Sequence, residues 1–346
     1  MRPFKEIYIG LLAALVTVGS SGFLSAAALD ELIAGAKKEG AVDFYAPSSL
    51  TPQGAEELAA AFNKKYGLNT RLRFHPSGSM TREVGKLVGM AATGVPPEWD
   101  LMVVTDAHHG TLWLRKLLVP FDYKSAGLDP NVVHYDGATI SFANQTVLPA
   151  YNKQTLPAKD VPKKWEDLLD AKWKGGKLGV SSASHHFARL AVGPWGEEKT
   201  TSFVKGIASQ KPILGRLAEV YNRLLLGEIS IAVTLTDSNI SDAKESGAPV
   251  VFAENVQPVV SPAYHAGVIK GAPHPKTAHL LAVFLASAEG QNIWEKHNGH
   301  ASAFIPGSNT YKFFQGKQAL FMNQDQAKVV DKLGRQYGKI LGFEGG

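Results

Sequence analysis

The amino-acid sequence predicts an α/β protein of two doubly wound lobes, joined by hinge strands, with a ligand cleft between the lobes. Strand and helix patterns alternate along most of the 346 residues, which favours sheets covered by helices. A long extended segment at residues 138–151 interrupts this alternation and is suited to cross from one lobe to the other. A chain of this length can form two lobes of roughly 100–150 residues each.

The first part of the chain shows the alternation most clearly. Its expected elements are a helix at 29–38, a strand at 41–46, a helix at 52–66, a strand at 69–75, a helix from Ser79 to about Thr93, a strand at 101–104 and a helix at 111–118. Leu58 and Phe62 share one face of the helix at 52–66, and Pro52 suits its first turn. Ser79 is a typical residue at the start of a helix.

The rest of the chain is expected to build the second lobe and then return to the first. After the crossing at 138–151 we expect a helix at 165–169, a strand at 177–180, helices from His185 and at 217–226, strands at 229–233 and 250–252, a second crossing at 256–260, and helices at 275–285, 288–297 and 321–341. Pro258 and Pro262 limit the second crossing to a sheet edge. The predicted lobes are residues 29–142 plus 259–305, and residues 143–258 plus 306–346.

The N-terminal residues 1–28 have the features of an export signal. Arg2 and Lys5 precede an uncharged apolar run, and small residues end the segment at Ala28. We therefore expect cleavage near Ala28 and a periplasmic mature protein. Residues 7–28 contain no charge and are also long enough for an uncleaved anchor, which is the alternative.

The composition narrows the function further. The chain has no Cys, which excludes disulfides, thiol catalysis and lipid attachment through an N-terminal Cys. The formal net charge is +5, but Lys and Arg are dispersed, so nucleic acid is not an expected partner. A location outside the cytoplasm disfavours enzymes that need ATP or nicotinamide. We expect a monomer without a resident cofactor or metal.

Four loops lie between a predicted strand and a helix and should face the cleft. Each combines hydroxyl groups with the free N–H groups of a helix start, which can together hold a carboxylate or phosphate. Simple helix capping is the alternative for any one of these serines. The candidate residues in the four loops are Ser48, Ser49, Ser77, Gly78, Ser79, Ser182, Ser184 and Thr236.

Four further residues complete the predicted site. Asp106 and Asp237 could accept hydrogen bonds from an amine or from sugar hydroxyls, or could be helix caps. His185 lies beside the turn at residues 182–184 and is interpreted as a hydrogen-bond donor, with an exposed loop residue as the alternative. Tyr264 follows the second crossing. Adjacent histidines such as His185 and His186 point in different directions and are not expected to chelate one ion.

Three segments resemble a known family. Residues 156–179 (LPAKDVPKKWEDLLDAKWKGGKLG), 224–233 (LLLGEISIAV) and 268–294 (VIKGAPHPKTAHLLAVFLASAEGQNIW) are similar to extracytoplasmic solute-binding proteins of ABC importers. These proteins have the type 2 periplasmic-binding fold, and the similar group includes ferric-ion, thiamine and phosphonate receptors. The resemblance implies closure of two lobes around a small-molecule solute, which is then delivered to an ABC permease in the inner membrane.

The resemblance leaves the solute open. Ferric-binding members carry an adjacent Tyr pair in the loop that corresponds to Thr234–Asn239, and this chain has no Tyr there. The loop at 46–49 (APSS) also lacks the His that iron-binding members often have. We therefore expect a small polar or anionic organic solute, with ferric ion as the alternative.

An exported serine hydrolase is the alternative from another class. Residues 179–183 (GVSSA) resemble a relaxed nucleophile elbow with Ser181 as the nucleophile. Asp237 or Asp242, followed by His265, His279 or His300, would complete the usual order of a triad. The motif lacks its final Gly and no HGGG-type segment precedes it, so we expect no enzymatic activity.

Overall fold

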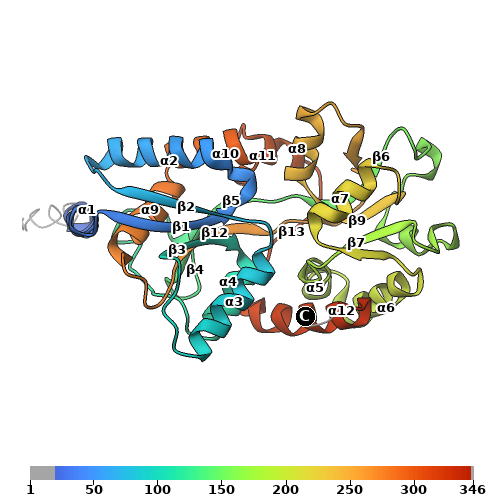
Figure 1. The fold of residues 1–346 in the computed structure, drawn as a ribbon, viewed down its shortest axis with the longest axis horizontal. Helices are drawn as coiled ribbons and strands as arrows, with labels where there is room; N and C mark the ends of the chain where they lie inside the picture. Colours follow the sequence, from blue (N-terminus) through green and yellow to red (C-terminus); the bar gives the residue numbers. More distant parts are fainter. Residues whose placement is uncertain (1–19, 344–346) are drawn as a thin grey trace, which may run out of the picture.

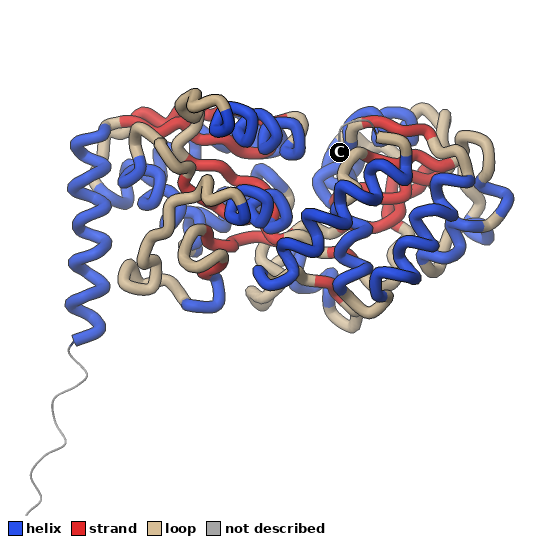
Figure 2. The backbone as a smooth tube through the Cα atoms, turned by 90° about the horizontal axis from the view of Figure 1, so that it is seen from below, coloured by secondary structure: helices blue, strands red, loops and turns tan. Residues whose placement is uncertain are grey.

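The computed structural model describes residues 20–343 of the chain. Most of the expected export signal, residues 1–19, lies outside these residues. Helix α1 (Ser20–Glu39) runs through the expected cleavage point near Ala28 and lies at one end of the molecule (Figures 1 and 2). Its buried residues Leu32 and Ala36 belong to the core that α9 (Pro275–Ala286) also joins. Within the described residues, no helix is long and apolar enough to cross a membrane.

The first lobe is built on a six-stranded sheet. The strand order is β2 (Arg71–Ser77), β1 (Ala41–Pro47), β3 (Leu101–Thr105), β12 (Ala263–Val268), β5 (Thr139–Asn144) and β4 (Val133–His134). β1 runs parallel to β2 and β3, while β12 runs antiparallel to β3 and β5. Helices cover both faces of the sheet, which confirms the doubly wound architecture.

Alternation along the central strands sends side chains into two cores. Phe44 and Val103 pack in the core with α1, α2 (Thr51–Tyr66), α9 and α10 (Ala288–Asn298). The neighbouring residues Tyr45 and Met102 point to the other face and pack with α3 (Met80–Ala92) and α4 (Asp106–Leu114). Figure 1 shows α2 and α10 on one side of this sheet and α3 and α4 on the other.

The second lobe is built on a seven-stranded sheet with one continuous core. The strand order is β13 (Ala319–Leu320), β11 (Val259–Val260), β6 (Val147–Asn152), β9 (Ile231–Thr236), β7 (Leu178–Ser181) and β8 (Ile213–Gly215), with β10 (Val250–Phe252) also paired to β6. Its helices are α5 (His185–Val192), α6 (Gly196–Ser209), α7 (Leu217–Leu225), α8 (Asp237–Glu245), α11 (Asn309–Phe314) and α12 (Ala327–Leu341). β7 runs parallel to β8 and β9, as in the first lobe β1 runs parallel to its neighbours.

The chain crosses between the sheets at two adjacent segments. β5 ends at Asn144 in the first sheet and β6 begins at Val147 in the second, so the predicted crossing is confirmed. The return runs from β11 to β12 through Pro262. The N–H of Gln145 donates to the carbonyl oxygen of Pro262 at 2.7 Å, which joins the two crossings. Figure 2 shows the two lobes side by side with the chain passing between them.

Strand pairing moves the predicted lobe boundaries by a few residues. Residues 143–144, predicted in the second lobe, pair with β12 in the first sheet. Residues 259–260, predicted in the first lobe, pair with β6 and β13 in the second sheet. The reason is that each crossing is made by the one or two residues that do not pair with a neighbouring strand. The extended segment begins earlier and is still paired in the sheet at its start.

Several elements were not predicted, and two were placed differently. β12, β8, α6 and α8 are additional elements, and α4 begins at Asp106, before the expected residue 111. The C-terminal helix begins at Ala327 because residues 319–320 form β13 and Asn323 caps a short 3-10 turn before the helix. α12 packs against α4 of the first lobe and against α5 and α6 of the second (Figure 1).

Gly290 lies in the first turn of α10, where α9 and α10 approach closely. A substitution at this position tests that packing. A Cβ at this position would lie 2.2 Å from the carbonyl oxygen of Phe284 and 2.9 Å from the Cα of Leu285. We expect Gly290→Ala to lower the free energy of unfolding by about 1–3 kcal/mol, because backbone atoms must move. Gly89→Ala is the control, since no atom lies within 4 Å of its Cβ position and it should raise stability by about 0.5–1 kcal/mol. Urea unfolding of both variants measures the difference, and equal midpoints would contradict the packing.

Candidate functional site

A cleft of about 460 Å³ lies between the two lobes. Residues from the loops after β1 and β2 line it on the first lobe, and residues from the loops after β7 and β9 line it on the second. The predicted site residues that line this interlobe cleft are Ser48, Ser49, Gly78, Ser79, Ser182, His185, Thr236 and Tyr264. The structure therefore brings together all four predicted loops, with Tyr264 of β12 between them.

Five helices begin at the interlobe cleft. They are α2, α3, α5, α7 and α8, each of which has residues of its start in the lining. The Oγ of Ser79 accepts from the N–H of Arg82 at 3.4 Å and so caps α3. α5 and α8 have no side-chain cap at their N-termini. The first-turn N–H groups of a helix have no partner inside the helix, and the helix dipole is positive there, so these ends favour an anion.

Three neutral imidazoles lie in the cleft wall. His108 of α4 is held at both ring nitrogens, at 2.7 Å from the Oγ1 of Thr105 and 3.2 Å from the Oγ1 of Thr81. Among residues 20–343, the Nε2 of His185 and the Nδ1 of His186 have no hydrogen-bond partner, and His186 is only 3 % exposed. Burial, reinforced by nearby positive charge, lowers the pKa of His108 and of His186 to about 3. The rings are therefore uncharged at neutral pH.

Other polar side chains of the lining hold one another in place. The amide of Gln145 donates to the Tyr264 hydroxyl at 2.6 Å, and the amide of Asn298 donates to the Oγ of Ser49 at 3.0 Å. Burial raises the pKa of Tyr264, so its hydroxyl stays protonated. Since this hydroxyl accepts from Gln145, its own hydrogen is free to be donated toward a ligand.

The other ionisable groups of the lining include two carboxylates and His297. Asp242 and Glu245 of α8 lie along the cleft, and burial together with the nearby Glu245 raises the pKa of Asp242. His297 is 2.7 Å from the carboxylate of Glu57. No Lys or Arg lines the cleft in the part of the chain that the structure describes. Attraction of an anion therefore depends on helix ends and neutral donors, and the carboxylates can accept from a donor group of the same solute.

Asp106 does not lie in the cleft lining, and the prediction of a free carboxylate there is wrong. Its side chain is buried and accepts from Arg189, with Nη1 at 2.9 Å from Oδ2 and Nη2 paired with Oδ1. Asp106 begins α4 in the first lobe and Arg189 belongs to α5 in the second. The pair is therefore a buried link between the lobes, and neither charge is available to a solute.

Asp237 and Ser184 also differ from the expectation. The Oδ2 of Asp237 accepts from the N–H of Thr146 at 3.0 Å, and its Oδ1 lies 2.6 Å from the Nε2 of His300, so this carboxylate holds the crossing segment. The Oγ of Ser184 donates to the carbonyl oxygen of Gly334 in α12 at 2.7 Å. Ser77 ends β2 opposite Pro47, and its part in the site stays a prediction.

The geometry around Ser181 does not match a nucleophile elbow. Ser181 is the last residue of β7, it is fully buried, and its Oγ is 3.3 Å from the Oγ1 of Thr234. A catalytic serine needs a general base within hydrogen-bond reach and an exposed position. Here the partner of Ser181 is another hydroxyl, so the structure gives no support to the hydrolase alternative.

Sequence reasoning missed several lining residues. Gln145, Asn239 and Asn298 lie in the wall, and the loops that carry them give no motif. His108 and His186 also line the cleft, and the sequence signal that could have pointed to each is an adjacent histidine. His186 lines the cleft together with its neighbour His185.

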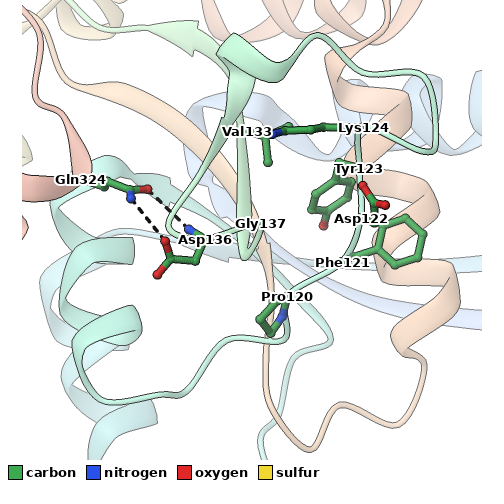
Figure 3. A pocket seen from close by; sticks show the side chains of 9 residues that line it. All are labelled: Pro120, Phe121, Asp122, Tyr123, Lys124, Val133, Asp136, Gly137 and Gln324. Atoms are coloured by element: carbon green, nitrogen blue, oxygen red, sulfur yellow. Dashed lines mark hydrogen bonds between the residues drawn. The ribbon is translucent and has the colours of Figure 1, made fainter.

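A separate hollow of about 490 Å³ lies on the first lobe and contains none of the predicted residues. Figure 3 shows its lining, and the N–H of Phe121 donates to the carbonyl oxygen of Gly137 at 3.0 Å. Gln324, from the segment before α12, donates to the carboxylate of Asp136 at 3.3 Å and accepts from the N–H of Tyr135 at 2.6 Å. These contacts fasten the C-terminal segment to the first lobe.

The fold and the cleft define a bilobal binding protein, and the comparisons with known proteins agree. Residues 57–319 match the family described as bacterial extracellular solute-binding protein. The chain belongs to this family, whose members bind solutes for ABC importers. The expected fold class and the resemblance are therefore confirmed.

Solved structures with the same fold share little sequence with this chain. Iron-bound HitA from Pseudomonas aeruginosa is 18% identical with a TM-score of 0.68, covering 86% of this chain and 99% of its own. An IdiA (FutA) protein of Trichodesmium, in complex with iron and citrate, is 20% identical with a TM-score of 0.64, covering 88% and 100%. An ABC transporter substrate-binding protein from Bradyrhizobium japonicum is 15% identical with a TM-score of 0.69, covering 87% and 99%.

The link between Asp106 and Arg189 can be tested by a double-mutant cycle. Removing either partner leaves a buried, unpaired charge, so Asp106→Ala and Arg189→Ala should each lower the free energy of unfolding by about 3–5 kcal/mol. The double variant should lose clearly less unfolding free energy than the sum of the losses in the two single variants. Glu219→Ala, which breaks the exposed pair with Arg216, is the control and should cost less than about 1 kcal/mol. Additive losses measured by urea unfolding would contradict the pairing.

Proposed function

We propose that this protein is the periplasmic receptor of an ABC importer and that it captures a small organic anion in the interlobe cleft. In this proposal the export signal is cleaved near Ala28, the mature protein is a monomer, and the lobes close over the solute. The closed form then presents the solute to a permease in the inner membrane. Binding of the solute to both lobes shifts the population toward the closed form.

The observation that carries the proposal is the meeting of several helix N-termini at one cleft. α2 and α3 begin there on the first lobe, and α5, α7 and α8 begin there on the second. An anion that contacts both sets at once gains interactions only when the lobes are together. The unpartnered ring nitrogens of His185 and His186 add two donors or acceptors on the second lobe.

Ferric ion is the second candidate, because two of the similar structures contain iron. The lining of this chain offers one tyrosine, Tyr264, and its hydroxyl stays protonated. In the described residues, the group of three side chains close enough to hold a metal ion is Asp43, Asp100 and His274. This group lies near the start of β1, away from the cleft, and Asp43 is already paired with Arg73. An organic anion therefore fits the cleft better than a bare ferric ion.

A panel of solutes tests the class of ligand. Purified protein should be stabilised against heat by phosphonates, sugar phosphates or carboxylates, because a ligand at 100 times its Kd adds about 2.7 kcal/mol to the folded state. Native mass spectrometry of the protein from the periplasm should show a bound organic mass that is lost on denaturation. Stabilisation by Fe(III) alone, or one tightly bound iron per chain, would favour the second candidate. Chemical turnover of any stabilising compound would contradict a receptor.

Substitutions at two helix caps distinguish an effect on solute binding from an effect on stability. Ser79 caps α3 at the cleft, and Ser287 caps α10 away from it. Ser79→Ala and Ser287→Ala should each cost about 1 kcal/mol of stability. Only Ser79→Ala should also lower the affinity for the solute, by about tenfold, because it alters the helix end that faces the anion. Isothermal titration with the best compound of the panel measures both affinities, and the same affinity in the two variants would refute this position of the site.

A further inference from the structure

We infer that the solute has an aliphatic or aromatic part, which enters a second hollow beside the interlobe cleft while the anionic group stays in the cleft. This inference rests on the proposed function. The second hollow, called the side pocket here, has a volume of about 250 Å³. Its lining comes from α3 and α4 of the first lobe and from α5 and α12 of the second, so it also closes when the lobes come together.

The side pocket and the cleft share part of their walls. Thr81, His108, Ser182 and His185 line both. His108 and His185 come from opposite lobes, and their ring centroids are 4.8 Å apart in an edge-to-face arrangement. A solute that contacts these two rings from the cleft is therefore already beside the side pocket.

The two histidines differ in how firmly they are held. His108 is fixed by hydrogen bonds to Thr105 and Thr81. The Nε2 of His185 has no partner among the described residues, so this ring is free to turn without losing a hydrogen bond at that nitrogen. Rotation of the His185 ring can thus widen the opening between the cleft and the side pocket. Its Nε2 can then form a hydrogen bond with a polar group of the solute.

The walls of the side pocket suit an apolar group. Val84, Val88, Ala107 and Val330 supply aliphatic surface, and Gly85 supplies no side chain. Gly85 is exposed, and a Cβ added there would meet no atom within 4 Å, so a larger side chain at this position has room to cover the side pocket. An apolar cavity of roughly 150 Å³ is enough for benzene, so the side pocket can take a phenyl group or a chain of several carbons.

The mouth of the side pocket excludes a cationic extension. Arg115, which follows α4, and Arg335 of α12 both lie against Asp331, at 3.8 Å and 2.5 Å. Two guanidinium groups and one carboxylate leave a positive excess. The polar hydroxyl nearby, that of Thr111, donates to Asp331 at 2.8 Å and is thereby occupied. The positive excess therefore disfavours a cation, and the aliphatic residues of the lining favour an apolar part, with an acceptor group only near the two arginines.

Filling the side pocket from Gly85 tests the inference. The probes are two pairs that differ only in the apolar part: methylphosphonate with 4-phenylbutylphosphonate, and acetate with 5-phenylpentanoate. Each buried methylene raises affinity about fourfold. Isothermal titration should therefore show that, in at least one pair, the phenyl compound binds the wild type at least tenfold more tightly than its methyl partner. Gly85→Phe should reduce that advantage below threefold and leave the methyl compound within twofold of its wild-type affinity.

Gly85→Ala is the matched control, because it removes the glycine but adds only one methyl group to open space. It should keep the tenfold advantage, and thermal unfolding should show that both variants fold. Equal affinity for the phenyl and methyl compounds in the wild type would overturn the inference while the anion receptor stands. So would an advantage that survives in Gly85→Phe. Failure of all four probes to bind the wild type would instead count against the proposed class of solute, and the side-pocket inference would fall with it.

Discussion

The function depends on a constraint of α/β folding: a helix that follows a parallel strand begins at the carboxyl end of that strand. In this protein the carboxyl ends of β1 and β2 face those of β7 and β9 across a cleft, so the helices of both lobes start there. Their first N–H groups have no partner inside the helix and concentrate positive potential in one small space. An anion can therefore be attracted without a lysine or arginine in the described lining.

Buried polar groups keep the cleft wall uncharged and link the two lobes. The histidines of the wall stay neutral because burial opposes their charged form, so their hydrogen bonding does not change near neutral pH. Behind them, Asp106 and Arg189 join the lobes through a salt bridge that no solute can reach. At the crossings, Gln145 contacts both Pro262 and Tyr264, which couples the hinge directly to the lining.

Much of the fold could be predicted from the sequence because its signals are local. The strand at 41–46, the helix at 52–66 and the cap at Ser79 each depend on a few neighbouring residues, and the structure confirms them. β12 was missed although it is central, because AYHAGV contains His265 and Gly267 and its pairing with β3 and β5 is formed by distant segments. Asp106 and Asp237 were misjudged for the same reason. Their partners, Arg189 and His300, lie far along the chain and are brought near only by the fold.

The C-terminal helix sets a limit on how the lobes can separate. α12 is bound to the first lobe through Asp331 and Thr111, and to the second through Gly334 and Ser184. In the proposed opening of the lobes this helix cannot follow both of them, so one of these hydrogen bonds has to break. Both hydrogen bonds lie in the wall of the side pocket, so a part of the solute held there would sit directly beside the contacts that have to break when the lobes separate.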